Sequence, residues 1–335
     1  MPYIKSFLVF FLMASCQTQT SDLVRVEGEA LGTTYHISYF SDHPIDMDTS
    51  LDSIFDLVNS SMSTYQRDSD ISRINRGEEG VKVDSMFMDV FRLSRQVYTQ
   101  SGGYFDPTVG DIVNLYGFGS EEGVMEPDST MVDSLMRFVG MDKVELDEEG
   151  VFKKKYPEVY IEFNAIAKGY AIDVIGDFLQ SRGVDNYLIE LGGELLAKGK
   201  NINKDTYWRV GVDDPQTESE TRQMIAVLEL RDRAMATSGN YRKFRVDPET
   251  GKQFVHTINP LTGFSERGDL LSVTVLAPNC SLADAYATAF MAMGFEKARN
   301  LVDRLSEVDV FFLYLDDNGK RQEYLTPGLE QVMID

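Results

Sequence analysis

The sequence has few of the residues that build disulfide frameworks and zinc sites. It contains two cysteines, Cys16 and Cys280, and three histidines among 335 residues. Two cysteines exclude a disulfide-stapled fold, because such folds need several pairs. Three histidines are too few for a histidine-rich zinc site with a separate catalytic base. The chain also lacks His-Glu-x-x-His, Cys-x-x-Cys, Gly-x-Ser-x-Gly and Walker Gly-x-x-x-x-Gly-Lys-Ser/Thr motifs, which removes several large enzyme classes.

Positive charge is also scarce. Thirty-two lysines and arginines face 54 aspartates and glutamates, giving a formal charge of −22. This balance argues against nucleic acid and against an anionic membrane surface as a partner. An anionic ligand would therefore need local help from a cation, a lysine or a helix N-terminus.

Long apolar runs are missing except near the N-terminus. Residues 7–13 are apolar and follow a single charge at Lys5, and a run this short is an export signal rather than a spanning helix. Met13-Ala14-Ser15-Cys16 resembles a lipoprotein cleavage box, although a plain secretory peptide remains an alternative. We predict a lipoprotein signal at 1–15, a polar tether at 16–23 after lipidated Cys16, and one catalytic domain at 24–335. The lipid on Cys16 would then attach an exported protein to a bacterial membrane facing the periplasm, with a weak preference for the outer membrane.

The chain mixes hairpins with helix pairs, which predicts an α+β fold with a largely antiparallel sheet flanked by helices in a single domain. Amphipathic spacing predicts helices from 51, from 84 to 101, and from 128 to 139 with Gly140 as its C-terminal cap. A longer helix is expected over 164–182 with Asn164 as its N-cap, followed by helices around 281–294 and 295–305. Strands are expected at 24–30, 34–40, 143–146, 159–163, 187–191, 208–212, 225–230, 241–246, 253–258, 270–276 and 308–315.

Asp284 and Thr288 stand one turn apart on an apolar, alanine-rich helix. Residues at i and i+4 share a helix face, so a carboxylate and a hydroxyl point the same way. Two such oxygen ligands suit a divalent cation that keeps water and phosphate in its other positions. The alternative is structural: Ser281 and Asp284 also form a capping-box pattern, and Thr288 can bond back to a helix carbonyl.

A second cluster, Glu162-Phe163-Asn164-Ala165-Ile166-Ala167-Lys168-Gly169, runs from a strand into a helix. Free N–H groups at the helix start and Lys168 in its first turns would form a phosphate-binding end. A lysine is unfavourable near a helix N-terminus unless an anion meets it, and this favours a functional role.

Three further glycine-rich clusters lie at the ends of expected elements, where binding residues usually lie. They are the stretch 101–119, which includes Tyr104 and Phe105, then Gly192-Gly193-Glu194, and then Thr237-Ser238-Gly239-Asn240-Tyr241 with His256-Thr257-Ile258-Asn259-Pro260-Leu261-Thr262-Gly263. Tyr104 and Phe105 offer aromatic area for a planar ligand, or are simply core residues. Gly192-Gly193 suggests a bulge or a backbone that a ligand approaches. His256 is either a proton shuttle or a structural histidine.

Taken in order, these clusters resemble the ApbE family of FAD:protein FMN transferases. The resemblance runs from Leu31-Gly32-Thr33-Thr34-Tyr35 to Met293-Gly294 and includes Ser63-Thr64-Tyr65 and Asp70-Ile71-Ser72-Arg73-Ile74-Asn75. It implies the T-fold-like architecture of that family and a magnesium site. The side chains of Asp284 and Thr288 and the carbonyl of Ala165 match the magnesium ligands, with Ala287 as a further carbonyl. The FAD-contacting positions that match are Leu31, Tyr65, Tyr104, Phe105, Asp106, Glu162, Lys168 and Ile258, and His256 matches a histidine suspected of catalysis.

The family usually has aspartate at the position of Glu162, glycine at that of Asn164 and methionine at that of Leu31, so the contacts of Glu162 and Asn164 differ in detail. The resemblance implies that FMN from FAD passes to a threonine hydroxyl on an exported redox-subunit acceptor, with AMP released. Asp284, Lys168 and His256 would be the catalytic residues. FAD hydrolysis to FMN and AMP, and storage of FAD by a non-catalytic lipoprotein, are the alternatives. A structural or adhesive surface lipoprotein would not explain the ordered glycine clusters.

Overall fold

The computed structural model describes residues 21–121, 123, 127–215, 223–239, 244–246, 253–265 and 268–334. Cys16, the signal at 1–15 and most of the tether lie outside these residues. The first strand begins at Asp22, two residues before the predicted start of the domain. Within the described part of the chain, no helix has the length and apolar character needed to cross a membrane.

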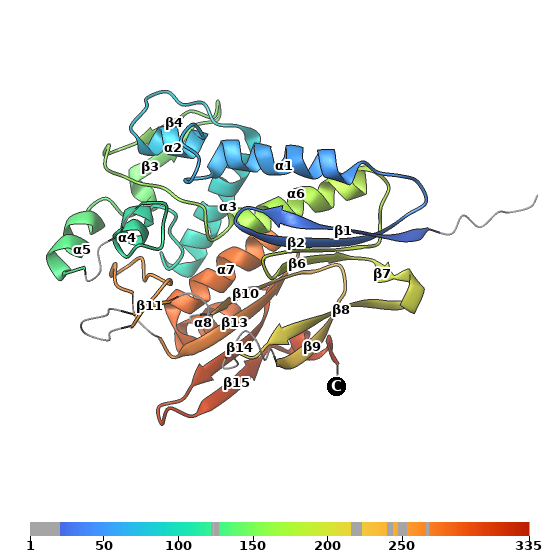
Figure 1. Cartoon of the computed structure of the whole chain (residues 1–335). Helices are drawn as coiled ribbons and strands as arrows, with labels where there is room; N and C mark the ends of the chain where they lie inside the picture. The colour runs from blue at the N-terminus through green and yellow to red at the C-terminus, as the bar shows by residue number, and fades with distance from the viewer. Residues whose placement is uncertain are drawn as a thin grey trace, which may run out of the picture.

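An eight-stranded sheet in which every pair is antiparallel forms the centre of the molecule (Figure 1). Its middle strands are largely buried on both faces; in β13 only one of eight residues is not buried. The strands, in spatial order, are β1 (Asp22–Ala30), β2 (Thr33–Ser41), β5 (Tyr187–Leu191), β6 (Glu194–Lys198), β10 (Ala234–Gly239), β13 (Leu270–Ala277), β14 (Asp309–Leu315) and β15 (Arg321–Leu325).

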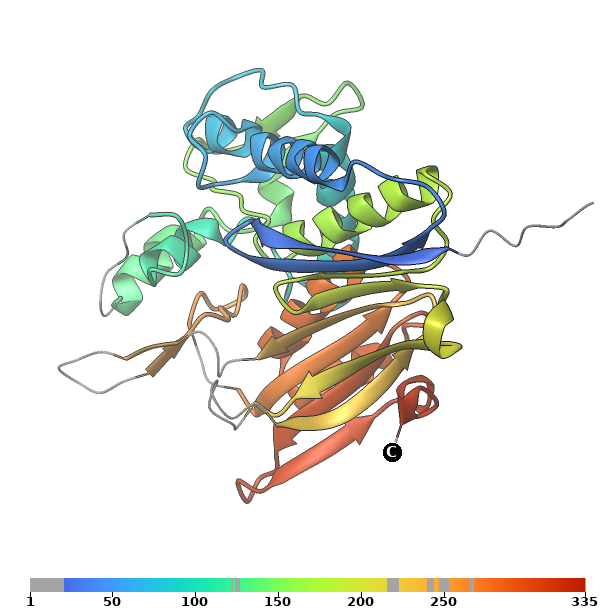
Figure 2. The same ribbon diagram turned by 45° about the vertical axis from the view of Figure 1, so that its right-hand side comes forward.

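Helices cover one face of this sheet and a second sheet covers the other. The helix side holds the larger core, to which Ile189, Val273 and Phe290 belong. On the opposite face the strands β8 (Thr206–Asp213) and β9 (Met224–Leu230) lie against the main sheet (Figure 2). A second core, which includes Trp208 and Leu228, joins the two sheets. The helices are α1 (Met47–Met62), α2 (Asp70–Asn75), α3 (Ser85–Ser101), α6 (Ala167–Ser181), α7 (Cys280–Met293) and α8 (Phe295–Val302). The second sheet contains β7 (Lys200–Asn201), β8 (Thr206–Asp213), β9 (Met224–Leu230) and β16 (Met333–Ile334), with η2 (Ile202–Lys204) and α9 (Pro327–Glu330) beside it.

A smaller group of elements has a core of its own, which includes Ile112, Val132 and Ile258. Figure 2 shows this group on the left, at the end of the molecule toward which the β1–β2 turn points. It comprises α4 (Gly110–Leu115), α5 (Ser129–Met136) and the hairpin of β11 (Phe244–Val246) and β12 (Gln253–Val255); η1 (Met141–Lys143) leads into the separate hairpin of β3 (Val144–Leu146) and β4 (Phe152–Lys154).

Strand register places several connections at one end of the main sheet. The β1–β2 turn at Leu31–Gly32 and the β5–β6 turn at Gly192–Gly193 share that end, because Tyr35 pairs with Leu191 and Leu191 with Glu194. β10 runs antiparallel to β6, so its last residue, Gly239, emerges there too. Segments that are far apart in sequence therefore meet at this end.

The predicted fold class is confirmed: the protein is a single α+β domain with antiparallel sheets and flanking helices. Several local predictions are wrong. The third helix ends at Met136, and Arg137 rather than Gly140 is its C-cap. The turn between the first two strands is expected at Gly32-Thr33 but lies at Leu31–Gly32, where both residues have positive φ (50° and 75°), as a two-residue type I′ turn requires.

The predicted strand at 159–163 does not form. The Asn75 side chain takes the place of a strand partner, donating to the Ile161 carbonyl at 2.8 Å and accepting from its N–H at 2.9 Å. Asn164 is not the N-cap of the next helix. Its amide donates to Glu162 Oε2 at 2.8 Å, and α6 begins at Ala167 after Ile166, whose side chain makes no capping bond.

Candidate active site

Three ionisable side chains from three elements meet in a largely buried cluster. The Lys168 ammonium donates to Glu194 Oε1 and lies 3.8 Å from Asp284 Oδ2. Glu194 and Asp284 are only 7% and 4% exposed. Glu194 Oε2 is buried and has no hydrogen-bond partner among the described residues. Burying a charge costs free energy unless the charge is paired. Two buried carboxylates beside one ammonium therefore indicate a functional site.

The backbone explains how each member reaches the cluster. Gly192 and Gly193, with φ of 61° and 90°, form the tight turn that makes Glu194 the first residue of β6. Lys168 is the second residue of α6, and Asp284 lies in the second turn of α7. The two helices cross at Gly169, where a Cβ would lie 2.5 Å from the Cys280 carbonyl oxygen.

Burial has the largest effect on the pKa of each of the three side chains in the cluster. Burial raises the pKa of Asp284, an effect that Lys168 opposes. Burial and the Asp284 carboxylate also raise the pKa of Glu194. Burial alone would lower the pKa of Lys168, but Asp284 and Glu194 raise it above its usual range. Two buried carboxylates thus share one ammonium, and the cluster favours an additional positive charge.

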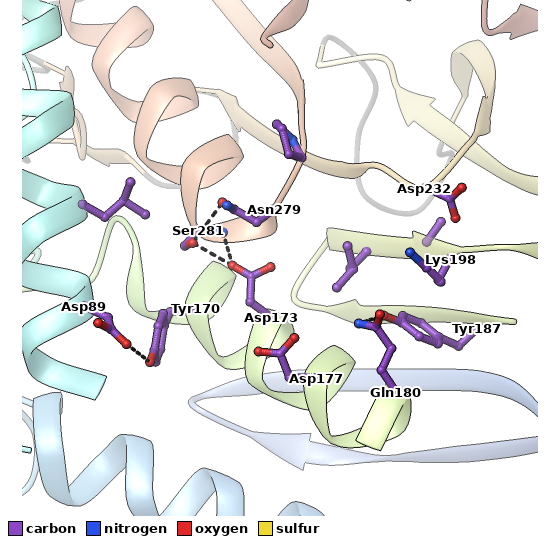
Figure 3. Close-up of a pocket in the computed structure, with 14 residues that line it drawn as sticks. Asp89, Tyr170, Asp173, Asp177, Gln180, Tyr187, Lys198, Asp232, Asn279 and Ser281 are labelled. Atoms are coloured by element: carbon purple, nitrogen blue, oxygen red, sulfur yellow. Dashed lines mark hydrogen bonds between the residues drawn. The ribbon is translucent and has the colours of Figure 1, made fainter. Parts of the chain in front are cut away.

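The start of α7 settles the capping alternative for Asp284. Asn279 is the N-cap and accepts from the Leu282 N–H at 2.9 Å. Asp173 of α6 adds a second cap, accepting from the N–H groups of Cys280 and Ser281 at 2.7 and 2.9 Å and from Ser281 Oγ at 2.7 Å (Figure 3). The capping-box interpretation of Asp284 is therefore wrong, and its carboxylate faces α6 instead.

Of the oxygen atoms expected to hold a cation, the Asp284 carboxylate lies at this helix crossing. The Gly169 N–H donates to Asp284 Oδ2 at 3.4 Å rather than to the carbonyl of Ala165, which precedes α6. Thr288 is half-buried on the Asp284 face of α7, whereas Ala287 is wholly buried. No three His, Cys, Asp or Glu side chains gather as a metal site in the described ranges.

Besides Lys168, four of the predicted FAD positions keep their side chains at least partly accessible. Tyr65 is 65% exposed, and its pKa is raised by partial desolvation of the hydroxyl and by the Glu162 carboxylate, so these two residues are neighbours. Burial raises the pKa of Glu162 to about 7 despite its bond from Asn164. Leu31 is half-buried in the positive-φ turn. The ring of Tyr104 lies 5.5 Å from Lys297 Nζ.

Three other predicted positions are buried. Phe105 is 4% exposed and belongs to the main core, and Ile258, 6% exposed, belongs to the core of the smaller group. Asp106 accepts from the N–H and hydroxyl of Thr108 at 2.8 and 2.6 Å, and burial raises its pKa to about 6. Its carboxylate holds the loop, so any ligand contact by Asp106 would come from its backbone.

His256 lies after β12 and approaches Phe118 edge-on, with ring centroids 6.5 Å apart. It thus belongs to the smaller group of elements at the same end of the molecule. Asn240 and Tyr241 of the neighbouring motif lie outside the described residues. A catalytic role for His256 stays a prediction.

Two residues of the site were not assigned from sequence. Glu194 sits in the Gly192-Gly193-Glu194 motif, which was noted only for its glycines. Asp173 follows Lys168 by five residues, and nothing in its local pattern indicates that it caps a helix more than a hundred residues away.

A separate cavity of about 430 Å³ lies beside the start of α7 (Figure 3). Its lining includes Asp89, Asp173, Asp177 and Asp232, against one lysine, Lys198, and it includes no member of the Lys168 cluster. An anionic dinucleotide would meet net repulsion there. We therefore do not assign this cavity to a flavin nucleotide.

The sequence pattern of the ApbE family matches residues 31–312 of this chain. An FAD:protein FMN transferase from Haemophilus influenzae is 34% identical over 319 residues, covering 92% of this chain and 90% of its own length. Another from Vibrio cholerae is 33% identical over 322 residues, covering 93% of each. The solved structure of the flavin transferase ApbE from Vibrio cholerae superposes with a TM-score of 0.83 at 32% identity, covering 93% of this chain and 99% of its own. This chain belongs to the ApbE family.

Proposed function

We propose that this protein is a magnesium-dependent FAD:protein FMN transferase. It takes FAD, transfers the FMN moiety to a threonine hydroxyl of an exported acceptor protein, and releases AMP. The observation that carries the proposal is the buried cluster of Lys168, Glu194 and Asp284 at the start of α6. Its excess of negative charge suits a cation, while the ammonium and the helix N-terminus suit a pyrophosphate.

The oxygen atoms present fit Mg²⁺. Asp284 supplies a buried carboxylate, Thr288 a hydroxyl on the same helix face, and Ala165 a carbonyl that the first turn of α6 does not use. These are hard oxygen donors, and they are few, as expected for an ion that keeps waters and substrate phosphates among its ligands. When bound, the ion would neutralise phosphate charge and act as a Lewis acid.

The residues of the chain have separable tasks in this reaction. Lys168 and the N–H groups at the start of α6 bind the pyrophosphate and stabilise the charge that builds up as the bond breaks. The acceptor threonine Oγ forms a bond to the FMN phosphorus, and the phosphoanhydride bond to AMP breaks. The hydroxyl proton passes to a base, for which His256 and a carboxylate are the candidates. AMP leaves with the anhydride oxygen.

The flavin and adenosine parts of FAD would be bound by the predicted FAD-contacting residues, which come from several helices, strands and loops. Leu31, Tyr65, Tyr104 and Glu162 keep accessible side chains for such contacts. Phe105, Asp106 and Ile258 would contribute backbone or shape, because their side chains are buried.

Export and lipid attachment through Cys16 complete the proposal. The acceptor is a separate exported redox subunit, because this chain has no clean copy of the family's acceptor motif, a threonine in a short Asp/Ser-Gly/Ala-x-Thr-Ser/Ala sequence. Hydrolysis of FAD by water in place of threonine is the second candidate function. The partly open cluster supports it, since the Lys168 side chain is 30% exposed and water has access to it.

The test is to incubate the mature protein with FAD, Mg²⁺ and a peptide carrying the family's acceptor motif, and to record peptide mass and free FMN. The proposal predicts a mass gain equal to FMN minus water on the peptide, together with AMP. Free FMN without a peptide product would assign FAD hydrolysis instead. Bound, unchanged FAD would assign storage, and either result would overturn the transferase proposal.

A further inference from the structure

The Glu194 carboxylate is only half engaged. Its Oε1 accepts from the Lys168 ammonium, while no donor among the described residues reaches its buried Oε2. The Glu194 carboxyl group also lies within hydrogen-bonding reach of the Asp284 carboxyl group. The residue is 7% exposed, so water does not readily solvate the second oxygen. A buried acceptor left unpaired costs free energy and persists where it has a role.

The Lys168 ammonium lies near two carboxylates, those of Glu194 and Asp284. It is in direct contact with Glu194 and lies 3.8 Å from Asp284 Oδ2, beyond hydrogen-bond distance. Attraction between such charges is strong in a buried setting. An ammonium without Glu194 would move onto Asp284, since no other carboxylate is described in contact with it. Asp284 would then be neutralised by a residue of its own chain.

We infer that Glu194 is a positioning residue that holds the Lys168 ammonium away from Asp284 and thereby leaves Asp284 free to bind a divalent cation. The inference rests on the proposed function, because it assumes that Asp284 is a cation ligand. It adds a residue that the sequence motif did not assign. Glu194 acts through Lys168 and needs no contact of its own with substrate.

The alternative is that Glu194 itself binds the cation through its free Oε2. The two roles make opposite predictions once Lys168 is removed. A positioning residue becomes irrelevant when there is no ammonium to hold. A ligand remains necessary whether or not Lys168 is present. A double-mutant cycle separates them.

The experiment measures Mn²⁺ binding to the full mature protein in the absence of FAD, by calorimetry and by the electron paramagnetic resonance signal of free Mn²⁺. The variants are Glu194→Gln, Lys168→Met and the double variant. Asp284→Asn is the control that removes the proposed ligand. Asp309→Asn is the matched control, because it removes the charge of a partly buried acid that pairs with Arg233 at 3.0 Å in β14, outside the cluster.

We expect Glu194→Gln to weaken Mn²⁺ binding about tenfold or more, in line with the loss of a residue that supports a metal ligand. Lys168→Met should bind at least as tightly as the wild type. Adding Glu194→Gln to Lys168→Met should change the affinity by less than about threefold, because the competing ammonium is gone. Asp309→Asn should leave the affinity unchanged.

The inference is overturned if Glu194→Gln binds Mn²⁺ as the wild type does. It is also overturned if Glu194→Gln weakens binding equally in the Lys168→Met background, which would make Glu194 a ligand. If Glu194→Gln fails to fold, Lys168→Met alone decides, since weaker binding by that variant contradicts competition. A wild type that binds no Mn²⁺, with Asp284→Asn identical to it, would remove the proposed cation site as well, so the two failures are distinguishable.

Discussion

Gly169 of α6 and Cys280 of α7 are in backbone contact, with room for a hydrogen atom but not for a methyl group. A Cβ on Gly169 would lie 2.5 Å from the Cys280 carbonyl oxygen and 2.8 Å from the Ser281 Cα. Both neighbours are backbone atoms and cannot rotate away. This contact brings Lys168 beside Asp284, so the site depends on it.

Gly169→Ala should therefore push the two helices apart. We expect a loss of about 1–3 kcal/mol in the free energy of unfolding, the usual cost of overpacking, and a large loss of FMN transfer. Urea unfolding and the peptide mass assay measure the two effects. Gly176→Ala in the same helix is the control, because its Cβ would meet side-chain atoms, Leu196 Cδ2 at 2.7 Å and Tyr187 Oη at 3.0 Å, rather than backbone. Equal stability loss in both variants would contradict this account.

The second cap on α7 is also testable. Asp173→Ala leaves the N–H groups of Cys280 and Ser281 without their carboxylate partner, and lost caps and unpaired buried donors each cost about 1–2 kcal/mol. The free energy of unfolding should fall by about 1–3 kcal/mol in urea titrations. Asp177→Ala, one turn further along α6 and exposed, should change it little. If Asp173→Ala left the free energy of unfolding unchanged, Asn279 alone would cap the helix.

Glu162 should make the stability of the ligand-free protein depend on pH. Its pKa is raised from 4.5 to about 7 by burial, so between these values the folded protein holds a proton that the unfolded chain releases. The free energy of unfolding from this group therefore falls as pH rises through that window and does not recover above it. Gln cannot ionise and avoids this loss.

Glu162→Gln should accordingly gain stability relative to the wild type between about pH 5 and about pH 8. Urea unfolding of both proteins at the two pH values measures the difference. The variant also keeps an acceptor for the Asn164 amide, so the comparison isolates ionisation. A stability difference that is the same at both pH values would show that Glu162 is not buried as an acid.

Elements with local signals were predictable from the sequence. Helix α3 has Asp84 as its N-cap, accepting from the Phe87 N–H at 2.8 Å, and Gly102 in the left-handed region at its end, and both features stand out in the sequence. Strands β6 and β10 were missed because ELLAK and AMATSG carry no strong strand pattern. They form strands because the neighbouring strands of the sheet supply their hydrogen-bond partners. Tertiary context overrides such weak local preferences.

In the site, too, some features have local signals in the sequence and others depend on tertiary contacts. The i, i+4 spacing of Asp284 and Thr288 and the position of Lys168 near a helix start are local features of the sequence, and the structure brings Lys168 and Asp284 to within 3.8 Å of each other. The contact of Lys168 with Glu194 spans 26 residues, and that of Asp173 with Ser281 spans 108. No local pattern reports which strand turn will lie beneath which helix. Only the sheet register and the close approach at Gly169 determine these partners.

The most direct test of the account is a single-turnover measurement of FMN transfer to the acceptor peptide by the wild type and by Asp284→Ala in excess Mg²⁺. We predict that the variant unfolds in urea with the cooperativity of the wild type but transfers FMN at least about 100-fold more slowly, the usual scale for losing a group that stabilises charge in the transition state. Asp177→Ala should transfer at the wild-type rate. Full transfer by Asp284→Ala would contradict the claim that the cluster around Lys168 is where the phosphoanhydride of FAD is broken.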